Sequence, residues 1–167
     1  MSWPRIRKPL IVQNRTDVAS ARAAAMALLA RRDYATSELL VRLTDHGFSE
    51  QAVAAAISEL TQERLLDDSR YAHNYVAYQA GRGRGPIRIA AELRRHGVEA
   101  AAVDAALRSG LDWRALARKV CRAKFGPQPP QNLTQTARQA RFLQYRGFSA
   151  DQIRAATGAE DLEPTEL

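Results

Sequence analysis

Several features that stabilise or localise other proteins are missing from this sequence. Cys121 is the only cysteine in 167 residues, so no intramolecular disulfide framework holds the fold together. No apolar run approaches the roughly 18 to 20 residues that a membrane-spanning helix needs. The basic opening stretch MSWPRIRKPLIVQNR has no long apolar segment and no small-residue cleavage site, unlike a secretory signal. These absences predict a cytoplasmic protein that does not associate with membranes.

Signals for β-strands are also scarce. β-branched runs bounded by turn residues are nearly absent, and glycine and proline are modest, at 9 and 7 residues. Alanine, leucine and arginine dominate instead, and 46% of the residues are hydrophobic, enough to build a core. Because alanine, leucine and arginine are strong helix formers, the composition predicts an all-α protein.

A phrase of about ten residues occurs three times: LTDHGFSEQAV, LRRHGVEAAAV and LQYRGFSADQI. Its glycines, Gly47, Gly97 and Gly147, are spaced fifty residues apart. Apolar residues recur four positions before each glycine and one, six and nine positions after it: Leu43, Leu93 and Leu143; Phe48, Val98 and Phe148; Val53, Val103 and Ile153; Ala56, Ala106 and Ala156. Such agreement identifies an internal repeat.

Each phrase has the pattern of a helix that ends and another that begins. A glycine just past the last helical turn adopts the left-handed conformation, and the apolar residue after it folds back onto the helix. Ser49 and Ser149 then stand where an N-cap hydroxyl is expected, whereas the second copy has Glu99, a weaker cap. A further amphipathic stretch precedes each phrase, so the pattern predicts nine helices.

We therefore predict three tandem three-helix modules, resembling helix-turn-helix repeats, in an elongated, curved array. The predicted segments are a basic N-terminal arm (1–17), module 1 (18–65), module 2 (66–110), module 3 (111–158) and an acidic C-terminal tail (159–167).

The net charge of +7 comes from the middle of the chain. Residues 81–125 hold 11 Lys and Arg against 4 Asp and Glu, whereas the flanking segments are nearly neutral. Such a concentration of arginine favours contact with phosphate or with an acidic protein surface. The residues predicted to bind a partner or DNA are Arg82, Arg84, Arg88, Arg94, Arg95, Arg118, Lys119, Arg122 and Lys124, with Arg138 and Arg141 as further candidates; Tyr78 could reach a base.

No pattern of catalytic or metal-ligating residues is present. His46 and His96 precede the helix-ending glycines, where a cation interacts favourably with the helix dipole, and His73 and Cys121 have no partner at ligand spacing. The segment GRGRGP follows a helix rather than a strand, unlike a nucleotide-binding loop, and is interpreted as a flexible, arginine-bearing loop. We expect no enzyme activity, no catalytic residue, no metal site and no cofactor.

Two alternative functions are open. The segment from Ser37 to Asp68 has the order of a helix-turn-helix, so module 1 could serve a sequence-specific, double-stranded DNA-binding transcriptional regulator. Its reading helix would carry Glu50 and Glu59 but no arginine, which is unfavourable for contacting bases. The third possibility is a scaffold that binds only protein.

The stretch ERLLDDSRYAHNYVAYQAGRGRGPIRIAAELRRHGV resembles the bacterial RecX family of regulatory proteins, modulators of the recombinase RecA. The residues that match this family's signature are Leu65, Asp67, Asp68, Arg70, Tyr71, Ala72, Tyr75, Gly83, Gly85, Pro86, Ile89, Leu93 and Gly97. The resemblance implies a fold of tandem three-helix modules. It assigns no catalytic residue to any position of this sequence.

It also implies a function in DNA repair, homologous recombination and the SOS response. A protein of this family binds the RecA filament on single-stranded DNA and inhibits the ATPase, recombinase and coprotease activities of RecA. Single-stranded and double-stranded DNA are expected to bind directly, weakly and without sequence specificity. The main contact is either RecA or DNA, and a monomer is expected.

Overall fold

The computed structural model describes residues 15–158. Most of the predicted arm (1–14) and the whole predicted tail (159–167) lie outside the described residues. Within the described part, nine α-helices account for the regular structure, and the only β-type pairing is an isolated bridge between Arg15 and Phe48. The predicted all-α fold class is confirmed.

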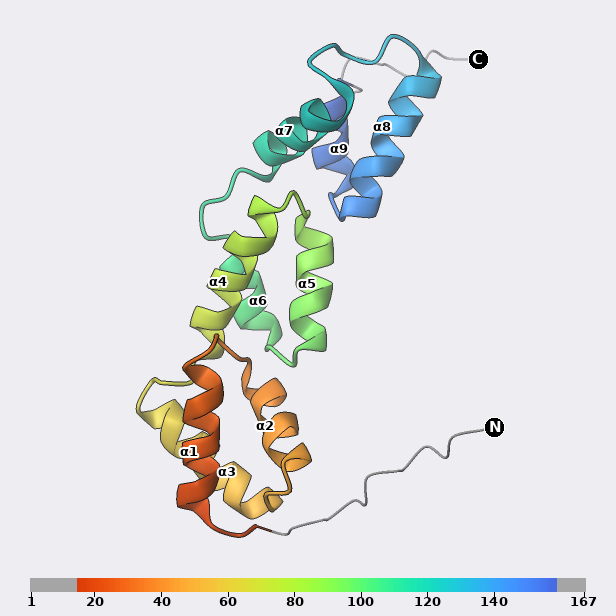
Figure 1. Ribbon diagram of the computed structural model, residues 1–167. Coiled ribbons are helices and arrows are strands. Elements are labelled where there is room, and N and C mark those ends of the chain that lie inside the picture. The colour runs from red at the N-terminus through yellow and green to blue at the C-terminus, as the bar shows by residue number, and fades with distance from the viewer. Residues whose placement is uncertain (1–14, 159–167) are drawn as a thin grey trace, which may run out of the picture. The chain divides into compact units, whose positions relative to one another are not determined.

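The helices belong to two compact units, one ending at Asp67 and the other beginning at Asp68. The first unit contains α1 (Val18–Leu29), α2 (Thr36–Asp45) and α3 (Glu50–Gln62). The second contains α4 (Asp68–Gly81), α5 (Pro86–Arg95), α6 (Ala100–Leu107), α7 (Trp113–Phe125), α8 (Leu133–Arg146) and α9 (Ala150–Thr157) (Figure 1). The residue boundaries given above for the predicted arm, modules and tail remain a prediction.

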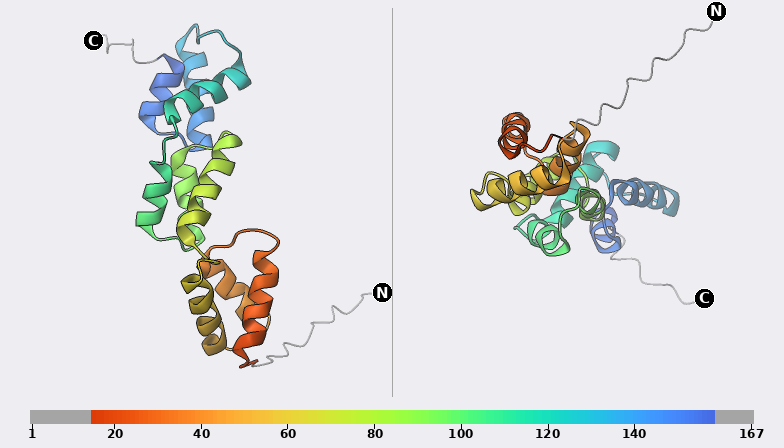
Figure 2. Two further views of the ribbon diagram at one scale, coloured as in Figure 1. Left: turned by 90° about the vertical axis from the view of Figure 1, so that its left-hand side faces the viewer. Right: turned by 90° about the horizontal axis from the view of Figure 1, so that it is seen from below.

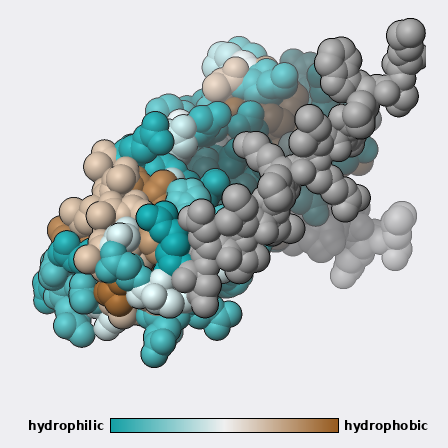
Figure 3. All heavy atoms as spheres, turned by 60° about the horizontal axis from the view of Figure 1, so that its bottom comes forward, coloured by the Kyte–Doolittle hydropathy of each residue, from teal (hydrophilic) through white to brown (hydrophobic). Residues whose placement is uncertain are grey.

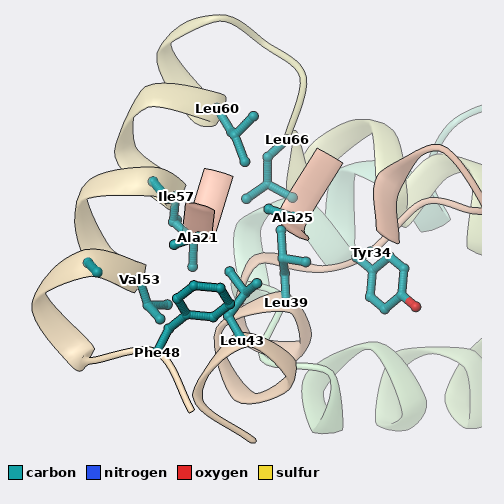
Figure 4. Close-up of a cluster of buried hydrophobic side chains, with 12 residues drawn as sticks. Ala21, Ala25, Tyr34, Leu39, Leu43, Phe48, Val53, Ile57, Leu60 and Leu66 are labelled. Carbon is teal, nitrogen blue, oxygen red and sulfur yellow. The ribbon is translucent and has the colours of Figure 1, made fainter. Parts of the chain in front are cut away.

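The core of the first unit forms where α1 and α2 pack on α3. On α3 the buried residues Val53, Ile57 and Leu60 recur at helical spacing and so share one face. Phe48, from the turn between α2 and α3, lies among Leu43 and Val53 in the middle of this cluster (Figure 4). The aromatic residue of the repeated phrase therefore anchors the first core.

The three glycines of the repeat end three helices in the predicted way. Their φ angles are +85°, +73° and +90° for Gly47, Gly97 and Gly147. After each of them the amide of the buried apolar residue donates to the carbonyl of the leucine five positions earlier, at 3.3 Å for Phe48 to Leu43, 3.1 Å for Val98 to Leu93 and 3.1 Å for Phe148 to Leu143. These bonds satisfy helix-terminal carbonyls and fold the apolar side chain back onto its helix.

The predicted helix starts are also found. The hydroxyl of Ser49 accepts from the amide of Ala52, and Ser149 forms a reciprocal capping box with Gln152. Glu99, by contrast, makes no side-chain capping bond to α6, which agrees with its interpretation as the weak cap. Pro86 is the first residue of α5, a position where its missing N–H costs nothing.

In the second unit, α4 packs on both α5 and α6, and α7 packs mainly on α9. Figures 1 and 2 show α8 and α9 close to the end of this unit's first three helices, where α4 passes into α5. A bidentate ion pair at 2.9 and 2.7 Å joins Arg114 of α7 to Asp151 of α9. Tyr71 of α4 shares a 2.8 Å hydrogen bond with Nδ1 of His96, so this histidine links α4 to the end of α5.

The segment between α4 and α5, residues 82–85, differs from the flexible loop that the sequence indicated. Its main chain lies against the turn at Gly147, where the amide of Gly85 donates to the carbonyl of Arg146 at 2.8 Å and the amide of Ile87 donates to that of Gly147 at 3.0 Å. Backbone bonds of this kind fix the segment in place. The glycines of GRGRGP therefore serve close backbone packing, and we call this segment the α4–α5 loop.

Candidate binding groove

A groove of about 370 Å³ lies in the second unit where the α4–α5 loop meets α7 and α8. Its floor is apolar, formed by Leu116 and Val120 of α7 and Phe142 of α8. Small residues of α4 and of the loop, such as Ala80 and Gly83, form one wall. Gly83 is needed there because its φ is +74° and an added Cβ would stand 3.0 Å from the Val120 side chain.

Four cationic side chains line this groove, and no acidic residue does. They are Arg82 from the loop, Lys119 and Lys124 from α7, and Arg146 from the end of α8. Because a groove lined by one sign of charge concentrates its field, it attracts anions. With an apolar floor and a cationic rim, the groove can accommodate a chain that has both phosphate charges and flat apolar bases, or an acidic peptide with apolar side chains.

Arg146 joins the two sides of the groove. Its Nη1 donates to the carbonyl of Arg82 at 3.2 Å, and its guanidinium stands 5.3 Å from the centre of the Phe142 ring. Arg82 itself donates to the hydroxyl of Tyr78 at 2.7 Å. Tyr78 is 60% exposed, so an aromatic ring stands beside the arginine at solvent. Such a ring is available for stacking on a base.

Arg84 and Arg88 are held together by one carboxylate. Nη1 of Arg84 lies 2.9 Å from both carboxylate oxygens of Glu92, and Nε of Arg88 lies 3.1 Å from Oε1. The hydroxyl of Tyr75 donates to Oε2 at 2.8 Å. Burial raises the pKa of Glu92, but these hydrogen bonds and the two guanidinium charges outweigh it, so the net pKa is lowered. The hydrogen bond to Glu92 in turn raises the pKa of Arg88.

A second hollow lies between α5 and α8. Arg88 and Arg95 line it together with Glu92 and the 78% exposed Tyr145, whose ring centre is 5.9 Å from the Arg88 guanidinium. Because Glu92 also lines this hollow, its lining is of mixed charge rather than purely cationic. The predicted residues Arg84 and Arg88 therefore maintain the structure around Glu92 rather than presenting unpaired charges.

The other predicted residues are dispersed. Arg94 is exposed in the last turn of α5, and Arg118 is half-buried on α7. Arg122 lines a different hollow, beside Cys121 and the Gly126–Pro130 connection. Of the nine predicted residues, the structure therefore brings Arg82, Lys119 and Lys124 together in the cationic groove, and the remaining six do not line it.

Arg146 was not among the residues predicted from the sequence, although the repeat contains a signal for it. It occupies the position directly before the glycine, which His46 and His96 fill in the other two copies. A cation at this position interacts favourably with the C-terminal end of its helix. The interaction with the helix end explains the two histidines without a binding function. The sequence pattern therefore did not indicate a binding function for Arg146 either.

Across residues 15–158, no group of three or more His, Cys, Asp or Glu side chains could hold a metal ion. Cys121 is buried, its thiol donates to Oε1 of Gln139 at 3.3 Å, and burial raises its pKa. In the same range, no helix is long and apolar enough to cross a membrane.

The fold is that of an all-helical repeat protein, and its second unit carries a groove lined by four cationic side chains. Family models for the first, second and third three-helix domains of RecX match residues 21–60, 67–107 and 112–157. The chain belongs to the RecX family of regulatory proteins.

Similar proteins support this assignment. A Regulatory protein RecX from Halorhodospira halophila is 43% identical over 84% of this chain and 88% of its own length. One from Stenotrophomonas maltophilia is 43% identical over 80% of this chain and 82% of its own. The crystal structure of RecX from Lactobacillus salivarius shares the fold, with a TM-score of 0.75 at 20% identity over 87% of this chain and 97% of its own.

Proposed function

We propose that this chain binds the RecA filament on single-stranded DNA and inhibits the ATPase, recombinase and coprotease activities of RecA. Membership of a family of regulatory proteins supports a regulatory function. The observation that carries the binding proposal is the groove with four cations and no acid. RecA filaments form on DNA in the bacterial cytoplasm, so the proposal includes a cytoplasmic location.

The mechanism requires no bond making or breaking. Lys119 and Lys124 would contact phosphates of the bound strand or carboxylates of RecA, while Tyr78 and the apolar floor contact bases or apolar side chains. A helical protein that occupies the filament in this way would hinder the subunit rearrangements that accompany ATP hydrolysis. We propose that it acts as a monomer.

Direct binding to DNA is proposed to be weak and insensitive to sequence. In single-stranded DNA, each phosphate contact contributes about −0.7 to the slope of log affinity against log salt concentration. If all four groove cations contact phosphates, the slope should approach about −3. Double-stranded DNA should compete regardless of its sequence, because contacts to phosphates carry no sequence information.

The decisive experiment titrates the chain into RecA on single-stranded DNA and follows ATP hydrolysis. The wild type should suppress hydrolysis at stoichiometric amounts, and Lys119→Glu with Lys124→Glu should weaken the suppression by about tenfold or more. Arg42→Glu is the matched control, because Arg42 is an exposed cation on α2, outside the groove. Unchanged hydrolysis with the wild type would refute the inhibitory function, whereas equal suppression by the double variant would refute the groove.

The position of the substitution matters for this test. Charge reversal at Arg84 would disturb the cluster around Glu92 as well as remove a cation. Lys119 and Lys124 are exposed on α7, so their substitution changes the charge without removing an ion pair found in the described residues. Circular dichroism of each variant should remain that of the wild type.

A further inference from the structure

The first unit carries an apolar groove that none of the functions above uses. It has a volume of about 360 Å³ and lies between α2 and α3. Leu40, Val41, Val53 and Ala54 form its apolar lining. Leu40 and Val41 are 44% and 54% exposed, so two adjacent large aliphatic side chains of one helix stand at solvent together. Figure 3, which turns the first unit toward the viewer, shows apolar side chains gathered on that unit.

The charged residues that line this groove are acidic. They are Asp45, the last residue of α2, and Glu50, the first residue of α3, and both are exposed. Among the described residues, no Lys, Arg or His lines the groove, Arg42 of α2 included. Neither carboxylate forms an ion pair with another described residue. The guanidinium of Arg15, a residue bonded to the adjoining turn, stands over the Phe48 ring at 4.7 Å instead. The two carboxylates are therefore available to cations of an occupant.

This charge decides which class of macromolecule the groove can hold. DNA would bring phosphates to two carboxylates and would meet no cation in the lining, an arrangement of like charges that opposes binding. Helix α3, which would enter DNA in a helix-turn-helix protein, has the sequence EQAVAAAISELTQ and carries no Lys or Arg. A protein segment with aliphatic and cationic side chains, by contrast, matches both the apolar lining and the carboxylates.

The dimensions of the groove limit what the occupant presents. On α2, Leu40 and Asp45 are separated by about 7.5 Å along the helix axis, at 1.5 Å per residue. Two aliphatic side chains one helical turn apart, about 5.4 Å, can cover this length. A Lys or Arg about one turn further along the same segment then lies beside Asp45 and Glu50. A short amphipathic segment is therefore sufficient to fill the groove.

We propose that the groove between α2 and α3 docks a protein segment of this kind, with two aliphatic side chains and an adjacent Lys or Arg, supplied by RecA. This inference rests on the proposed function and adds to it the place where the protein component of the filament is recognised. The buried aliphatic surface provides the driving force, and Asp45 and Glu50 select a cationic segment. The cationic groove of the second unit has the reverse chemistry, so contact with protein and contact with anions are made by different surfaces.

A charge reversal at Asp45 tests the proposal. The affinity of Asp45→Lys for RecA filaments on single-stranded DNA should be about tenfold lower than that of the wild type, measured by fluorescence anisotropy of the labelled chain. Because a cation at the C-terminal end of α2 is favourable for the helix, the loss would not come from unfolding. Affinity for single-stranded DNA without RecA should not fall.

The matched control is Glu99→Lys, which makes the same change of charge at an exposed carboxylate of the second unit. It should bind filaments at least as tightly as the wild type, since added positive charge favours DNA. If Asp45→Lys binds filaments as tightly as Glu99→Lys, the proposal is overturned. Tighter binding of Asp45→Lys than of this control would instead indicate that the groove holds DNA.

Photo-cross-linking identifies the occupant directly. Benzoylphenylalanine in place of Val41 should cross-link to RecA within the filament, at a peptide with aliphatic side chains next to Lys or Arg. The same probe at Leu133, a 76% exposed residue of the second unit, should not yield that peptide. Cross-links to DNA or to a second copy of this chain would overturn the proposal.

Failure of this inference can be told apart from failure of the proposed function. A wild type that neither binds filaments nor suppresses ATP hydrolysis would overturn both. A wild type that binds and suppresses hydrolysis, but whose Val41 probe never reaches RecA, would overturn only the assignment of the groove.

Discussion

Gly85 approaches Gly147 so closely that a Cβ added to Gly85 would lie 2.3 Å from the Gly147 carbonyl oxygen. The obstructing atoms belong to the backbone, so no side-chain rotation relieves the overlap. The φ of Gly85 is −87°, which any residue can adopt. Glycine is therefore required here for the space it leaves rather than for its conformational freedom.

Gly85→Ala should consequently loosen the contact between the α4–α5 loop and the turn at Gly147. Overpacking of this kind costs about 1 to 3 kcal/mol in the free energy of unfolding, measured by urea denaturation. Gly81→Ala is the matched control, because a Cβ at Gly81, the last residue of α4, meets nothing within 4 Å. An equal loss of stability in both variants would contradict the close contact.

Glu92→Gln should weaken the cluster that holds Arg84 and Arg88. The pKa of Glu92 is lowered from 4.5 in the folded protein, so its carboxylate stabilises the fold above about pH 4.5 and this contribution is lost as the pH falls through the lowered pKa. We expect the variant to be less stable near neutral pH by about 1 kcal/mol.

The difference between wild type and variant should shrink on acidification, as measured by denaturant unfolding at a series of pH values. A difference that keeps its neutral-pH size as the pH falls through the lowered pKa would show that the carboxylate charge does not stabilise this cluster. Asp104→Asn, at a half-buried carboxylate on α6 outside the cluster, serves as the comparison.

Glu99→Ser should stabilise the protein. Glu99 already has the extended backbone of an N-cap residue, with φ −61° and ψ 145°, but its side chain makes no capping bond. A serine hydroxyl there can accept from the free amides of α6, which contributes about 1 kcal/mol. In a thermal melt this corresponds to an increase of about 4 °C or more.

Removal of the capping serine at the matching position of the third copy provides the counterpart. Ser149→Ala removes the capping box at α9 and should cost about 1 kcal/mol. If neither variant alters the melting temperature, capping is not what distinguishes the second copy from the third.

The Cys121 thiol should react slowly with alkylating reagents in the folded protein. It is 5% exposed, and burial raises its pKa, so the reactive thiolate is rare at neutral pH. The reaction should proceed at the ordinary rate of an exposed cysteine once the chain is unfolded in urea. Rapid labelling under native conditions, followed by mass spectrometry, would contradict the burial.

The sequence was sufficient to predict the helix ends because their signals are local. Each turn is determined by a leucine, a glycine four residues after it and an apolar residue directly after the glycine, through bonds that span a few residues, as from Phe148 to Leu143. Ser49 and Ser149 were recognisable as caps for the same reason.

The groove could not be predicted in the same way. Its four cations come from positions 82, 119, 124 and 146, and the fold alone brings them together. The sequence showed a high density of arginine but not which guanidinium groups are paired internally. In the sequence, Arg84 and Arg88 are equivalent to Arg82 as candidate binding residues. In the structure, Arg84 and Arg88 form ion pairs with Glu92.

The joint at Gly147 is built from amides and carbonyls, which every residue type supplies. Side chains around such a joint can be exchanged extensively while the hydrogen-bonded path of the backbone stays the same, provided that the small residues at its closest points are kept. Substitutions can therefore change the surface charge of these repeats, and with it the choice of partner, while the backbone contacts between the helices stay the same. A shared fold at 20% identity is the expected result of that freedom.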